Sequence, residues 1–126
     1  MSQDWSELIP FYNDFLNYKG WDSIKVLIQF VSDLIGSRNL DDLYYHTSHH
    51  RLCITLDEEY EIWRDKPILT IDAISDSIIS IEIAVEVREA PDIYRAYIEK
   101  VHVPVEDSLH YFDEMIEKYK KKCVEQ

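Results

Sequence analysis

The segment 79–87 constrains the fold more than any other part of the chain, because apolar and polar residues alternate along it without interruption. Isoleucine or valine occupies every odd position, and serine, alanine or glutamate every even one. This period of two residues is typical of a β-strand with one face in a hydrophobic core. We therefore expect Ile81, Ile83 and Val85 to be almost fully buried beneath a layer of helices.

Further strands are expected on both sides of this one. Alternation around Leu52–Leu56 predicts a strand, and the segments Tyr60–Trp63 and Ile68–Ile74 are separated from it by charged or proline-containing turns. The segment Tyr94–Val103 has apolar spacing that also fits a helix. Its β-branched end, followed directly by Pro104, favours an edge strand.

Helical spacing marks the two ends of the chain. Apolar residues recur every three or four positions in segments 4–18 and 24–35, and again from about 108 to 119. The predicted fold is therefore α+β, with two N-terminal helices, a mainly antiparallel sheet of about four to six strands and a C-terminal helix. The helices are expected to pack on one face of the sheet. No linker-like stretch divides the chain, which predicts a single domain over residues 1–126.

The charge balance excludes several classes of partner. With 13 basic and 25 acidic residues among 126, the formal net charge is −12. Binding to the phosphates of nucleic acids or to anionic membranes needs the opposite sign of charge. The chain has neither a secretory leader nor a spanning apolar segment, so a cytoplasmic protein is expected. Two glycines are too few for a phosphate-binding loop, and no cofactor is expected.

A histidine cluster is the strongest hint of metal or nucleophilic chemistry. His46, His49 and His50 are followed by Cys53, but their spacing matches no known zinc-ligand pattern. We interpret the histidines as part of a polar, solvated loop and expect no metal. Cys53 alternates with inward-facing leucine and isoleucine, so it belongs to the other face of its strand. No signature of catalysis accompanies it, and the chain is not expected to be an enzyme.

Acidic side chains next to aromatic ones suggest a surface for binding another protein. Carboxylates near tryptophan or tyrosine can combine electrostatic steering with a desolvated anchor. One candidate patch is a charged turn, and a second is the polar face of the strand at 79–87. The predicted partner-binding residues are Asp57, Glu58, Glu59, Glu61 and Trp63 in the first patch, and Glu82 and Glu86 in the second.

In size, charge and composition the chain resembles immunity proteins that neutralise bacterial toxins, and also small phage inhibitors of defence enzymes. The resemblance implies an inhibitor that binds a basic partner, such as a nuclease toxin. Two alternatives remain open. One is a small-ligand-binding or enzymatic domain with a pocket between helices and sheet. The other is a structural subunit that forms a homodimer through a sheet edge or through its aromatic first helix.

Overall fold

The computed structural model describes residues 4–57, 66–89 and 92–125. Two helices come first, α1 (Leu8–Phe15) and α2 (Lys25–Ser37), each preceded by a short 3₁₀ turn. Pro10 lies in the first turn of α1, where its missing N–H has no helical acceptor to lose. Gly20 connects the two helices with a φ of 94°, a left-handed conformation that glycine adopts without steric cost.

Five strands follow and form one antiparallel sheet in the order β1-β2-β3-β4-β5. Their bounds are Tyr44–Ser48 for β1, Arg51–Thr55 for β2, Ile68–Ala73 for β3, Ile78–Glu89 for β4 and Asp92–Pro104 for β5. A last 3₁₀ turn leads into helix α3 (Ser108–Glu125). The structure thus confirms the α+β class and the predicted order of helices and sheet, and it makes 94–103 a strand.

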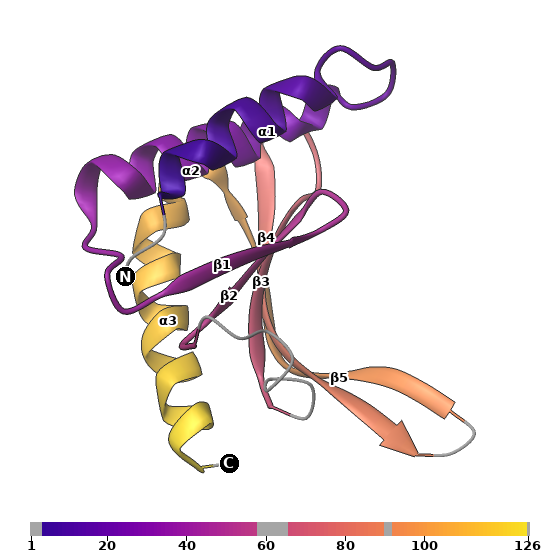
Figure 1. Cartoon of the computed structure of the whole chain (residues 1–126), viewed down its shortest axis with the longest axis vertical. Coiled ribbons are helices and arrows are strands. Elements are labelled where there is room, and N and C mark those ends of the chain that lie inside the picture. The colour runs from indigo at the N-terminus through magenta and orange to yellow at the C-terminus, as the bar shows by residue number, and fades with distance from the viewer. Residues whose placement is uncertain (1–3, 58–65, 90–91, 126) are drawn as a thin grey trace.

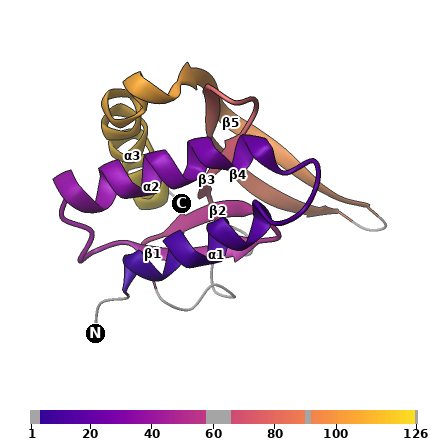
Figure 2. The same cartoon turned by 90° about the horizontal axis from the view of Figure 1, so that it is seen from above.

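The three helices pack on one face of the sheet, as predicted. Helices α1 and α2 lie side by side across the end of the sheet at the top of Figure 1, while α3 runs down one side. Seen from above in Figure 2, α2 lies between α1 and α3, and α1 lies on the β1 side of the sheet. The layer encloses one hydrophobic core, whose fully buried large side chains include Tyr12, Ile24, Leu27, Phe30, Leu34, Leu52, Ile54, Leu69, Ile71, Ile79, Ile81 and Tyr119.

Polar contacts hold the helices in place around this core. Just beyond α2, Arg38 donates from Nε and Nη2 to the two carboxylate oxygens of Asp113 in α3, at 2.8 and 2.7 Å. On the other side of α3, Lys118 donates to Glu99 of β5 at 2.7 Å. Within the described residues, no helix is both long and apolar enough to cross a membrane.

Strand β4 differs from expectation at one position. Ile81 and Ile83 have no exposed surface, but Val85 is only half-buried. The pairing of β4 with β5 shifts register between Ile83 and Ala84. Beyond this bulge the two strands run on as a ribbon that extends away from the helices (Figure 1). Val85 therefore lies where the covering layer ends.

Candidate functional site

Most of the predicted acidic turn lies outside the described residues. Asp57 follows β2 and is exposed, with its backbone carbonyl accepting a hydrogen bond from the Thr55 hydroxyl at 2.7 Å. Glu58, Glu59, Glu61 and Trp63 fall in the segment that the structure does not describe. Their role in binding a partner stays a prediction.

The structure describes one of the two side chains of the second predicted patch, Glu82, and places it differently from expectation. Glu82 does lie on the face of β4 opposite the helices, yet it is 2% exposed and is not part of a solvated acidic surface. Its strand is flanked on both sides, with Thr70 of β3 and Lys100 of β5 directly beside Glu82, and Arg51 of β2 reaches its carboxylate. Glu86 lies in the same strand beyond the bulge.

Charged side chains on this face, which no helix of the described residues covers, neutralise one another. We call the face the polar sheet face. Arg51 bonds to Glu82 and also approaches Asp72 of β3, with Nε 3.6 Å from Oδ2. His50 Nε2 lies 2.8 Å from the other oxygen of Asp72, and Lys100 Nζ lies 3.8 Å from Glu82. Burial of a carboxylate is tolerated only with such partners, so these groups form a structural network.

The histidine cluster is organised differently from the predicted loop. His46 lies within β1, opposite Cys53 of β2, and only His49 and His50 form the turn between the strands. Burial lowers the pKa of His46 below its ordinary value of 6.5, which favours the neutral ring. His49 has a φ of 58° and is exposed. Among the described residues, no three histidine, cysteine or acidic side chains are grouped as metal ligands.

Cys53 is buried although no described helix covers its face of the sheet. It is 4% exposed, and the Thr70 hydroxyl lies 3.9 Å from its sulfur. A hollow of about 260 Å³ borders it, lined by Cys53 and by His46, Thr47 and Ser48 of the neighbouring strand. A buried thiol in these surroundings fits a structural cysteine better than a reactive one, because reactive cysteines are partly exposed and lie near positive charge.

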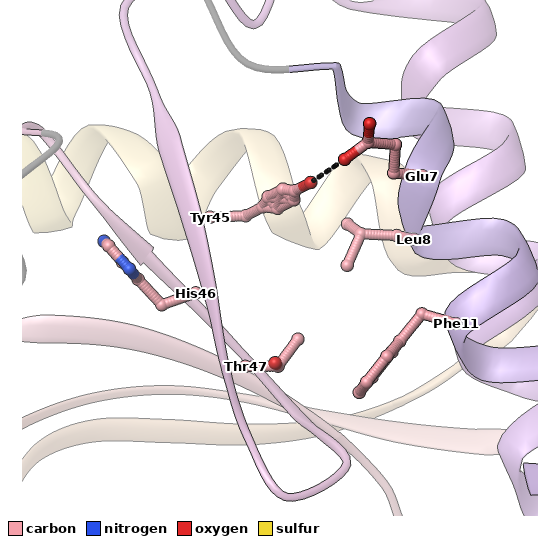
Figure 3. Close-up of a pocket in the computed structure, with 6 residues that line it drawn as sticks. All are labelled: Glu7, Leu8, Phe11, Tyr45, His46 and Thr47. Carbon is pink, nitrogen blue, oxygen red and sulfur yellow. Dashed lines mark hydrogen bonds between the residues drawn. The ribbon is translucent and has the colours of Figure 1, made fainter.

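The structure reveals a groove that the sequence analysis did not anticipate. Its volume is about 350 Å³, and it separates helix α1 from strand β1. Figure 3 shows both walls, and the lining residues are Glu7, Leu8 and Phe11 on the helix side and Tyr45, His46 and Thr47 on the strand side. We call it the α1–β1 groove.

Tyr45 bridges the groove at one end. Its hydroxyl lies 3.5 Å from a carboxylate oxygen of Glu7 and 3.3 Å from the backbone carbonyl of Asp4, and its ring stacks on Trp5 at a centroid distance of 5.1 Å. Burial, and then the charge of Glu7, raise the pKa of Tyr45. The phenol therefore stays protonated at neutral pH and donates to these acceptors. His46 points away from Glu7, to the other side of the strand (Figure 3).

None of the protein families, curated proteins or solved structures compared with the chain matches it. Its function is therefore inferred from its own charge and geometry.

Proposed function

We propose that the protein binds and neutralises a basic protein partner, as an acidic inhibitor of the immunity or antitoxin type. A nuclease toxin is the proposed class of partner, because nucleases present basic surfaces to nucleic acid. The supporting observation is where the charges lie. The best-buried carboxylate, Glu82, is held by basic side chains, whereas exposed acidic side chains outnumber exposed basic ones over the described residues.

This distribution has a kinetic consequence for a binding protein. Exposed charge of one sign raises the rate of encounter with a partner of opposite sign, and salt suppresses that gain. The paired groups of the polar sheet face contribute little to this field, because their charges cancel locally. The surplus that steers a partner therefore comes from solvated carboxylates.

The test begins with the immobilised protein and a lysate of the cells that express it. A retained basic protein is then purified, and the proposal expects a one-to-one complex in which the partner's own activity is blocked. Association should slow by about tenfold or more between low and physiological salt. The proposal would be contradicted by a partner that stays fully active in the complex, or by an association rate that does not change with salt.

Two charge-reversed variants test whether the predicted acidic turn is the surface that binds the partner. The double variant Glu58→Lys, Glu59→Lys should slow association at low salt more than Glu114→Lys, Glu117→Lys does. Both variants change the net charge equally, and the control positions are exposed on α3. Equal slowing by both variants would mean that total charge, and not the acidic turn, guides the partner.

A further inference from the structure

The α1–β1 groove carries a further inference, because its walls combine apolar surface with one negative charge. Tyr45 and Thr47, two positions apart in β1, lie on the same face of the strand and face α1. From the helix, Leu8 and Phe11 point into the same space (Figure 3). The groove therefore lies between a helix and one face of the sheet. Small-ligand sites in proteins are built in this way, with mostly apolar walls and a few polar groups that orient the ligand.

Two aromatic rings line the groove, and each is held in place by other aromatic residues. The ring of Phe11 makes edge contacts with Tyr12 and Phe15, at centroid distances of 5.1 and 5.4 Å. The ring of Tyr45 stacks on Trp5. Because these contacts fix both rings, the walls of the groove are preformed. An aromatic ligand can pack against them with little loss of side-chain entropy.

Glu7 makes one end of the groove negative. Its carboxylate is exposed, and in the described part of the chain no lysine or arginine pairs with it. Its contact with the Tyr45 hydroxyl, at 3.5 Å, is longer than a strong hydrogen bond. The carboxylate therefore keeps the capacity to accept a hydrogen bond from an ammonium group. Such a bond is stronger than one from a neutral donor, because both of its partners are charged.

The volume of the groove sets the size of its ligand. A water molecule takes up about 30 Å³ of the liquid, so a groove of about 350 Å³ holds about a dozen non-hydrogen atoms. We infer that the α1–β1 groove binds a small arylalkylamine, with its aromatic ring against Leu8 and Phe11 and its ammonium group against Glu7. This site is additional to the proposed partner surface and does not depend on it.

Charge favours this ligand over the other occupants of such a groove. A second copy of the chain would bring a further net charge of −12 to the interface. An anionic ligand would place its own charge against Glu7, and both arrangements are repulsive. An arylalkylamine matches the apolar walls with its ring and the carboxylate with its amine. The remaining occupants are outcomes of the test.

The test titrates the folded protein with tryptamine and follows the backbone amide shifts by NMR. The shifts should saturate with a dissociation constant of about 1 mM or lower, and they should be largest at the residues that line the groove. Indole-3-propionate is the matched control ligand, because it has the same ring and chain with a carboxylate in place of the amine. It should bind at least about tenfold more weakly.

A pair of variants tests the charge. Glu7→Gln keeps an acceptor for Tyr45 but removes the negative charge, and it should weaken tryptamine binding by about two- to fivefold. Asp14→Asn removes an equal charge at an exposed position of α1 outside the groove, and it should leave binding unchanged.

A second pair of variants tests the space. Thr47 is exposed in β1, where an aromatic residue is compatible with a strand, so Thr47→Phe should fill the groove and weaken tryptamine binding by about tenfold or more. Ser48→Phe places the same side chain at the next exposed position, outside the groove, and should bind as the wild type does. The amide spectrum of each variant shows directly whether it is folded.

The inference is overturned if tryptamine and indole-3-propionate bind equally, or if Glu7→Gln and Asp14→Asn weaken binding equally. Shifts that are scattered over the acidic surface and do not saturate also overturn it, because they indicate only general attraction of a cation. Shifts of the groove amides that follow protein concentration without tryptamine would assign the groove to a second copy of the chain and overturn the inference as well.

Discussion

At the scale of single residues, the polar sheet face shows how misleading one strand's pattern can be. Glu82 occupies an even position of an alternating strand, which normally indicates a solvated face. Its burial depends on Arg51 and Lys100, which lie on two other strands. A carboxylate so placed is stable only while its partners remain, because removal of a partner leaves a buried charge unpaired.

This dependence predicts a strong effect of removing Arg51. Arg51→Met should lower the free energy of unfolding by about 3 kcal/mol, measured by urea denaturation at neutral pH. The double variant Arg51→Met, Glu82→Met should recover most of the loss, since it removes both charges. Lys100→Met, at a more exposed partner 3.8 Å away, should cost less than about 1 kcal/mol. If Arg51→Met, Glu82→Met were as unstable as Arg51→Met alone, the loss of stability would not come from an unpaired Glu82 charge.

His46 predicts a pH dependence of stability. Burial lowers its pKa in the folded protein below the ordinary 6.5, so the unfolded chain takes up the proton first as the pH falls. The folded state is therefore penalised progressively from about pH 6.5 downward, and the penalty levels off below the lowered pKa. His46→Gln should lose less stability than the wild type between pH 7 and pH 5 in urea titrations. If the free energy of unfolding fell equally with pH in the wild type and in His46→Gln, His46 would be excluded as the cause of the pH dependence.

At the scale of elements, the strands with regular alternation were predictable and those with mixed composition were not. Strand β4 has a clean period of two, and Ile79, Ile81 and Ile83 lie in the core where that period puts them. Strand β1 reads Tyr-Tyr-His-Thr-Ser and has no apolar alternation, so its histidine resembled part of a loop. Its aromatic and β-branched residues, followed by a two-residue connection to β2, were the signal that could have identified it.

Because β4 lies against the core, truncating an isoleucine in it should cost much more stability than truncating an exposed isoleucine elsewhere. Ile83→Ala should reduce the free energy of unfolding by about 2–5 kcal/mol, because a fully buried side chain is truncated. Ile74→Ala makes the same chemical change at a position that is 47% exposed, and should cost less than about 0.5 kcal/mol. Urea denaturation measures both. A similar cost at the two positions would show that Ile83 is not in the core.

At the scale of the whole molecule, the net charge of −12 affects the stability of the folded state itself. Like charges gathered on a compact surface repel one another, and the repulsion is weaker in an expanded chain. The ion pairs within the protein oppose this effect only locally. The acidic surface is therefore expected to reduce the stability of the folded state.

This repulsion predicts that salt stabilises the protein. Raising sodium chloride from about 0.01 to 0.15 M shortens the screening length from about 30 to 8 Å, and the melting temperature should rise. The variant Glu114→Lys, Glu117→Lys has a smaller net charge and should show a smaller rise. A melting temperature that falls with salt would mean that the ion pairs outweigh the repulsion.

The sequence by itself determined the class of fold, the order of its elements and the sign of its surface charge. These follow from local spacing and composition, because a helix or strand with one buried face repeats its apolar residues at a fixed period. Only the tertiary structure decided that Glu82 is buried, that Val85 is half-exposed and that a groove separates α1 from β1. Each of these depends on neighbours far away in the chain, since side chains on adjacent strands lie about 5 Å apart whatever their separation in sequence.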